Sequence, residues 1–238
     1  MLTTDTDTKP VALITGAAGS LGRSIAEAFH RNGYRLALLD RRLETLRETA
    51  ATIDGQSLLL EADLGEATEV LAATQATLER WSRIDVLCNV AGGFRMGTRV
   101  HETSDADWLA ILQMNAGSVL RTARAVVPTM IAQRHGRIVN IGADSAQRGK
   151  ALMGPYCMSK AAVHSLTQSM AAELGPEGIH VNCILPSVLD TPQNRLDMPA
   201  SMHASFVPLA RVAGLAAYLA SSDADALNGV LIEATASS

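Results

Sequence analysis

The segment that decides the fold of this chain is Val11-Ala12-Leu13-Ile14-Thr15-Gly16-Ala17-Ala18-Gly19-Ser20-Leu21-Gly22. Its first five residues are apolar or β-branched, a pattern that predicts a strand buried on both faces. A glycine-rich turn follows and leads into a helical pattern that continues to about Asn32. A strand, a glycine-rich turn and a helix in this order predict a dinucleotide site, because glycines let the backbone approach a pyrophosphate and the helix N-terminus favours its charge.

The same alternation of strand and helix continues along the chain. Further strands are predicted over residues 35–39, 57–62, 85–88, 137–141, 179–184 and 230–233, and further helices over residues 66–81, 105–133, 156–174 and 207–221. This order predicts an α/β single-domain Rossmann fold, a doubly wound seven-stranded parallel sheet with helices on both faces. One domain would span residues 1–238, with residues 1–9 as a disordered leader, and would bind its ligand at the carboxyl ends of the strands.

Composition narrows the function classes. The 238 residues are 47% hydrophobic and 18% charged, which suits one globular core. The net charge is −4 and no block of like charge stands out, so nucleic acid and membranes are not expected as partners. The polar N-terminus and the lack of long apolar runs predict a cytoplasmic protein.

The cysteines and histidines show no metal-binding pattern. The three cysteines (Cys88, Cys157 and Cys183) are scattered, and no two histidines have ligand spacing. We therefore expect neither a disulfide framework nor a metal site.

An acidic residue ends the second predicted strand. Asp40 can accept hydrogen bonds from the adenosine ribose hydroxyls and repel a 2′-phosphate, which favours NAD(H) as the cofactor. Arg41 and Arg42 follow at once; they could pair with a 2′-phosphate or simply open a helix as solvated charges. NADP(H) therefore stays open.

The segment Gly154-Pro155-Tyr156-Cys157-Met158-Ser159-Lys160 carries the candidate chemistry. Tyr156 and Lys160 are four residues apart in a helical pattern, so their side chains share one helix face. A cation there, with a positively charged nicotinamide, could lower the phenol pKa from its ordinary value of about 10 toward neutrality. Tyr156 would then donate a proton to a ketone or accept one from an alcohol.

From residue 11 to residue 233 the chain resembles the short-chain dehydrogenase/reductase family. The segments that carry the resemblance are Thr15–Gly22, Asp63, Asn89-Val90-Ala91-Gly92, Asn115, Tyr156 with Lys160, and Pro186–Thr191. Asn115 is also unusual by itself, because an amide inside a helix competes with the backbone.

The resemblance implies a role for each of these residues. Tyr156 would be the acid/base, Lys160 would lower its pKa and hold the nicotinamide ribose, and Asn115 would order a water in a proton relay. Asp63, with Leu64 beside it, would contact the adenine. The remaining cofactor-binding residues implied are Gly16, Ala18, Ser20, Leu21, Gly22, Asp40, Arg41, Asn89, Ala91, Gly92, Pro186, Leu189 and Thr191.

Three residues depart from the family pattern. Ser20 replaces a glycine of the cradle, which is tolerable if that position needs no positive φ. Val90 replaces an asparagine and should cost one structural hydrogen bond. Ala143 stands where the family has its catalytic serine; Ser145 could replace it if the loop is remodelled.

The loop from Gly142 to Tyr156 and the run from Leu189 to Pro199 resemble the dihydropteridine reductase branch, which also lacks the serine. The leading hypothesis is an NAD(P)-dependent oxidoreductase that moves a hydride between nicotinamide and a small carbonyl, alcohol or quinonoid substrate. One alternative is reduction of a quinonoid pterin. Another is a dinucleotide-binding protein with little redox activity. The resemblance also implies a homodimer or homotetramer.

Overall fold

The computed structural model describes residues 9–53 and 57–236. The predicted leader thus lies outside the described residues, except for Lys9. All seven strands of the sheet are parallel, in the order β3-β2-β1-β4-β5-β6-β7. They are β1 (Val11–Thr15), β2 (Arg35–Asp40), β3 (Leu58–Glu61), β4 (Val86–Asn89), β5 (Gly136–Ile141), β6 (Ile179–Pro186) and β7 (Leu231–Ala234).

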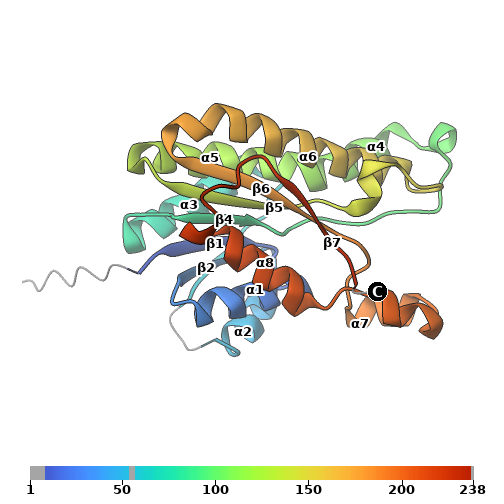
Figure 1. Ribbon diagram of the computed structural model, residues 1–238, viewed down its shortest axis with the longest axis horizontal. Helices are drawn as coiled ribbons and strands as arrows, with labels where there is room; N and C mark the ends of the chain where they lie inside the picture. The colour runs from blue at the N-terminus through green and yellow to red at the C-terminus, as the bar shows by residue number, and fades with distance from the viewer. Residues whose placement is uncertain (1–8, 54–56, 237–238) are drawn as a thin grey trace, which may run out of the picture.

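Helices cover both faces of the sheet (Figure 1). One face carries α1 (Ser20–Arg31), α2 (Leu43–Ala50) and α8 (Leu209–Leu219). The other carries α3 (Ala67–Trp81), α5 (Ser118–Gln133) and α6 (Gly154–Leu174). The predicted doubly wound Rossmann fold is confirmed.

Strand β1 shows why these residues form a central strand. Its five side chains are all buried, and alternate ones enter different cores. Ile14 packs in the core that includes Ile25 and Phe29 of α1, whereas Leu13 packs in the core that includes Met130 of α5. A strand covered on both faces needs mostly apolar side chains, which residues 11–14 have; the one polar side chain, Thr15, has its hydroxyl bonded to the N–H groups of Val90 and Ala91.

Two predicted elements differ in the structure. The single helix expected over residues 105–133 is α4 (Asp105–Leu112), a π-helical turn (Gln113–Gly117) and then α5. The region after β6 that was expected to be a loop contains the short helix α7 (Pro192–Asp197), whose first turn is capped by Thr191 accepting from the backbone of Asn194. Cap residues of this kind favour helix initiation.

Candidate active site

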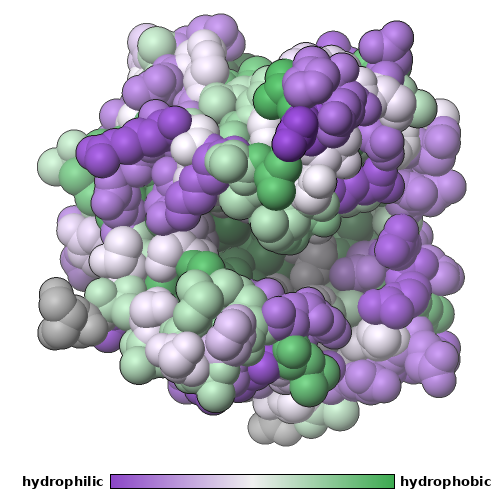
Figure 2. Space-filling model, turned by 90° about the vertical axis from the view of Figure 1, so that its right-hand side faces the viewer, coloured by the Kyte–Doolittle hydropathy of each residue, from purple (hydrophilic) through white to green (hydrophobic). Residues whose placement is uncertain are grey.

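A cleft of about 740 Å³ lies at the carboxyl ends of the strands, a size typical of small-molecule sites. Figure 2 looks onto this edge and shows the hollow between an upper and a lower wall. Most of the predicted site residues line it: Gly16, Ser20, Leu21, Gly22, Asp40, Arg41, Asp63, Leu64, Ala91, Gly92, Tyr156, Lys160, Pro186, Leu189 and Thr191. The residues that do not line it are Ala18, Asn89, Asn115 and Ser145.

The glycine-rich turn is built without space for side chains. Gly16 has φ +65°, and a Cβ on it would lie 2.8 Å from the backbone of Ala91. A Cβ on Gly22 would lie 2.1 Å from the carbonyl oxygen of Gly16. Ser20 is the first residue of α1 and has no positive φ, so the departure at this position is accommodated as predicted.

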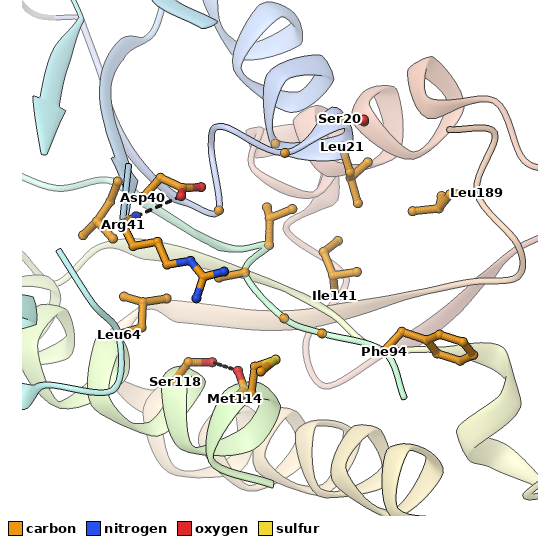
Figure 3. Close-up of a pocket in the computed structure, with 18 of the residues that line it drawn as sticks. Ser20, Leu21, Asp40, Arg41, Leu64, Phe94, Met114, Ser118, Ile141 and Leu189 are labelled. Carbon is orange, nitrogen blue, oxygen red and sulfur yellow. Dashed lines mark hydrogen bonds between the residues drawn. The ribbon is translucent and has the colours of Figure 1, made fainter. Parts of the chain in front are cut away.

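Asp40 lies beside this turn at the end of β2. Its Oδ2 accepts from the backbone N–H of Ala18 across 3.2 Å, and its Oδ1 accepts from the N–H of Arg41 across 2.8 Å. Figure 3 shows the Arg41 side chain running from this point into the cleft. The loop after β2 therefore presents both an anion and a cation to a ligand. Ala18 does not line the cleft itself. Its contribution is the backbone hydrogen bond that orients Asp40.

Asp63 and Leu64 follow β3 at the same end of the cleft. The Oδ1 atom of Asp63 accepts from the N–H of Gly65 across 2.7 Å, which fixes the turn. Arg121 of α5 donates to the carbonyl oxygen of Leu64 across 3.1 Å. Both residues line the cleft, and Asp63 is exposed to solvent; their contact with an adenine stays a prediction.

Tyr156 and Lys160 lie one turn apart on α6 and line the same cleft. The pKa of the Tyr156 phenol is raised to about 12, mainly by burial and to a smaller extent by Cys157 and Asp144. The lowering of this pKa by Lys160 together with a positively charged nicotinamide stays a prediction, because in the polypeptide alone the desolvation of the phenolate dominates.

Lys160 is itself buried, and burial lowers its pKa to about 8. Its Nζ donates to the carbonyl oxygen of Ile141 across 2.8 Å. The ammonium is thus fixed at the end of β5, at the floor of the cleft.

Asn115 occupies the π-helical turn between α4 and α5 and is buried. Its Nδ2 donates to the carbonyl oxygen of Gly93 and to the Oγ of Ser159, and its Oδ1 accepts from the N–H of Gly93. The side chain therefore ties the loop after β4 to helix α6. A π-turn inside a helix often marks a functional site. Here it carries Asn115, whose side-chain oxygen and NH2 group make these three bonds.

Asn89 was predicted to line the cofactor cleft, and this is wrong. Asn89 is buried inside the sheet, where its Nδ2 donates to Asn140 across 2.9 Å and its Oδ1 accepts from Thr122 across 2.7 Å. Asn140 continues the chain of bonds to Thr167. An amide at the end of a strand can turn either way, and its two partners, Asn140 and Thr122, hold it inside the protein.

Neither Ala143 nor Ser145 brings a hydroxyl into the cleft. Ser145 is buried in a short 3-10 turn and does not line it. The proposed replacement of the missing serine by Ser145 is therefore not supported, and its assignment as a catalytic residue is withdrawn. Instead, the N–H of Ala143 faces Nε2 of buried His164 across 3.4 Å.

The comparisons with known proteins agree with this geometry. A protein family described as short chain dehydrogenase matches residues 10–199. The chain belongs to this family. A sorbitol dehydrogenase from Cereibacter sphaeroides is 39% identical over 180 residues, which cover 75% of this chain and 70% of the relative. A 2-(R)-hydroxypropyl-CoM dehydrogenase from Xanthobacter autotrophicus is 34% identical over 238 residues, with coverage of 93% and 95%.

The fold of this short-chain dehydrogenase is shared with solved structures. The crystal structure of NAD+-bound xylitol dehydrogenase superposes with a TM-score of 0.89 at 24% identity, covering 96% of this chain and 98% of that one. As a member of the family, the protein is an oxidoreductase. In residues 9–53 and 57–236, no helix is long and apolar enough to cross a membrane, and no three metal-ligating side chains gather into an ion site.

Several residues that line the cleft of this short-chain dehydrogenase lay outside the sequence motifs. They include Gln113, Met114, Ser118 and Ile141. Met114 and Ser118 enter from the π-turn and the start of α5 (Figure 3). The position of Met114 and Ser118 depends on the extra residue that the π-turn inserts into the helix. In the sequence, the one sign of that turn is Asn115, an amide residue inside a predicted helix.

Proposed function

We propose that this short-chain dehydrogenase is an NAD(H)-preferring oxidoreductase in which Tyr156 is the acid/base for a small carbonyl or alcohol substrate. One observation carries the proposal: Tyr156 and Lys160 line the same cleft as the glycine-rich turn and Asp40. A proton-transfer group and a dinucleotide cradle therefore face one continuous space. The relatives named as sorbitol and hydroxypropyl-CoM dehydrogenases support an alcohol or ketone substrate.

The cleft fits a dinucleotide cofactor. Side chains are excluded from the cradle at Gly16 and Gly22, where any Cβ would collide with backbone atoms. The N-terminus of α1 follows directly and favours a phosphate. Gly16, Ser20, Leu21 and Gly22 would hold the pyrophosphate, Asp40 the adenosine ribose and Lys160 the second ribose. When bound, the nicotinamide supplies or accepts the hydride.

The protonation state of Tyr156 limits both directions of the reaction. With a pKa raised to about 12, the phenol carries its proton at neutral pH, so it can be the donor to the oxygen of a carbonyl that is being reduced. It is a weaker acid than an ordinary phenol, however, so donation also gains from a positive charge in the cleft. In the oxidative direction the same phenol must lose its proton, which requires stabilisation of the phenolate beyond what the polypeptide provides. A positive charge in the cleft would give that stabilisation.

The preference for NAD(H) rests on Asp40. Its carboxylate is held by two backbone N–H groups beside the glycine-rich turn, so it cannot easily swing away from a 2′-phosphate. Arg41 also enters the cleft and would offset part of this repulsion. We therefore expect a preference for NAD(H) with measurable use of NADP(H).

Two alternatives have support of their own. Ala143 provides no hydroxyl for a single developing alkoxide, and reduction of a quinonoid pterin, where charge spreads over ring heteroatoms, needs that donor less. The missing serine also favours a dinucleotide-binding protein without redox activity. The presence of Tyr156 and Lys160 together in the cleft favours an enzyme over the second alternative.

One panel of assays separates these functions. Oxidation of NADH and NADPH should be followed with an aldehyde, a β-ketoester, a simple quinone and quinonoid dihydropterin. Turnover of the carbonyl compounds with NADH supports the proposal, and turnover of the pterin alone supports the first alternative. Tight NADH binding with no turnover across the panel supports the second. Light scattering tests the expected homodimer or homotetramer.

A further inference from the structure

The two ends of the cleft differ in charge. At one end, charged side chains line the cleft at or just after the ends of β2 and β3: Asp40, Arg41, Arg42 and Asp63. Of the described residues that line the cleft after β4, β5 and β6, up to Thr191, Lys160 alone is charged; the uncharged ones include Gly93, Phe94, Gly142, Pro186, Ser187 and Leu189. Figure 3 shows Asp40 and Arg41 at one end, Phe94 and Leu189 at the other, and Ile141 between them. The ammonium of Lys160 donates to the carbonyl oxygen of Ile141, and under the proposed function its remaining donors go to the second ribose of the cofactor. With the cofactor bound, the end near Tyr156 would therefore have no free charged side chain to pair with a charged substrate.

Phe94 forms an aromatic wall beside the phenol. The ring centroids of Phe94 and Tyr156 are 4.9 Å apart and the rings are inclined by 79°, an edge-to-face contact. Yet 55% of Phe94 is exposed, and it lines the cleft. An aromatic ring that is fixed on one side and uncovered on another offers apolar surface to a ligand that reaches the phenol oxygen.

The loop that carries Phe94 is held in place. The N–H of Gly97 donates to the carbonyl oxygen of Leu152 across 2.9 Å, which joins this loop to the segment before α6. Leu152 itself adopts φ +63°, a conformation that is uncommon for a leucine. Arg95 pairs with Asp107 of α4 across 2.5 Å. Phe94 is thus positioned before a substrate arrives.

We propose that Phe94 is a specificity-determining residue, and that the substrate is an uncharged ketone or secondary alcohol with an aromatic ring next to the reacting carbon. The inference rests on the proposed function, because it takes Tyr156 as the group that meets the substrate oxygen. The aromatic ring of the substrate packs against Phe94, while the carbonyl oxygen reaches the Tyr156 hydroxyl. A carboxylate at this end of the cleft would be desolvated without a partner, which disfavours oxo acids.

The test compares four ketones with NADH: acetophenone, cyclohexyl methyl ketone, 2-butanone and pyruvate. We expect kcat/KM for acetophenone to exceed that for 2-butanone by about tenfold or more, with pyruvate lowest. Phe94→Ala should lower the ratio of kcat/KM for acetophenone to that for 2-butanone about fivefold to tenfold, as expected for the loss of an aromatic contact. Phe94→Leu should lower kcat/KM for acetophenone relative to kcat/KM for cyclohexyl methyl ketone. Met96→Ala is the control and should leave these ratios unchanged. Met96 is an exposed apolar residue of the same loop and does not line the cleft.

The outcomes separate this inference from the proposed function. Turnover of all four ketones with no preference for acetophenone, or ratios unaffected by Phe94→Ala, overturns the inference and leaves the proposed function standing. If no ketone is reduced, the proposed function fails, and thermal unfolding with acetophenone decides the inference. A rise in Tm for the wild type that Phe94→Ala abolishes supports it, and no rise overturns it.

Discussion

The Nζ atom of Lys160 donates a hydrogen bond to the carbonyl oxygen of Ile141 across 2.8 Å. Ile141 is the last residue of β5, so this bond links helix α6 to the carboxyl edge of the sheet. The lysine is buried, and its pKa is lowered to about 8 by the loss of hydration. The protein therefore holds a cation at the floor of the cleft at a cost in stability.

This cost makes the stability of the protein depend on pH. Between about pH 8 and the ordinary lysine value of 10.5, the unfolded chain binds more protons at this site than the folded chain does. The penalty is fully present below pH 8 and is relieved as the pH rises toward 10.5. Replacing Lys160 with Met removes this free-energy penalty and its dependence on pH. Relative to Lys160→Met, the wild type should gain up to about 3 kcal/mol of unfolding free energy between pH 7.5 and pH 10.5.

Urea unfolding of both proteins across this range measures the difference. Titration of groups that Lys160 does not affect is common to both and cancels. Lys160 acts on His164, whose pKa lies below 6.5, and on Cys183, whose pKa is raised to about 12, so both titrate outside this range. A difference in unfolding free energy that stays constant with pH would show that Lys160 is not a buried cation.

Asp40 sets the preference between the two cofactors. Replacing it with Ala removes a carboxylate that would repel a 2′-phosphate and leaves Arg41 in the cleft. The ratio of kcat/KM for NADPH to that for NADH should rise about tenfold or more, as for the loss of roughly 1.4 kcal/mol of repulsion. Glu61→Ala is the matched control, because Glu61 pairs with Asp40 in the sheet but does not line the cleft. An unchanged ratio in Asp40→Ala would remove the argument for NAD(H).

The glycine-rich turn is intolerant of side chains. In Gly22→Ala the new methyl group would lie 2.1 Å from the carbonyl oxygen of Gly16 and 2.7 Å from the Cα of Ala17. Only backbone movement can relieve this, so NADH should bind at least about tenfold more weakly, with a loss of roughly 1–3 kcal/mol of stability. Gly214→Ala in α8 meets no atom within 4 Å and should be neutral or slightly stabilising. Fluorescence titration with NADH and thermal unfolding compare the two, and equal NADH affinity would contradict the cradle.

Asn115 should act mainly through position. In Asn115→Ala the N–H and carbonyl of Gly93 lose their side-chain partners in a partly buried place. We expect a loss of about 2–4 kcal/mol in unfolding free energy and a larger fall in kcat than in NADH affinity. Ser118→Ala is a useful comparison, because Ser118 bonds only to carbonyls of its own helical turn. Wild-type stability in Asn115→Ala would show that the π-turn does not depend on this side chain.

The fold was predictable because it depends on repeated local patterns. The buried run Val11–Thr15, the glycines that follow it and the regular return of strands are all visible in the sequence, and the structure agrees to within about two residues at most strand and helix ends. The orientation of Asn89 was not predictable, since its partners Asn140 and Thr122 lie far away in the chain. The same is true of the exclusion of Ser145 from the cleft.

The electrostatics of the pair on α6 were also beyond the sequence. Helical spacing showed that Tyr156 and Lys160 share a face, but not that both are largely shielded from water. Burial acts in opposite directions on the two groups: it raises the phenol pKa to about 12 and lowers the ammonium pKa to about 8. The net effect depends on the whole surroundings of α6 rather than on the four-residue spacing.

The measurement that tests the central claim most directly is the turnover of Tyr156→Phe, compared with its affinity for NADH. Phenylalanine keeps the ring that packs against Phe94 and lacks only the hydroxyl group, which carries the proton that the substrate needs. We predict that turnover falls by at least about 100-fold, within the range for loss of a general acid, while the Kd for NADH changes less than about threefold. Undiminished turnover in Tyr156→Phe would contradict the assignment of Tyr156 as the acid/base.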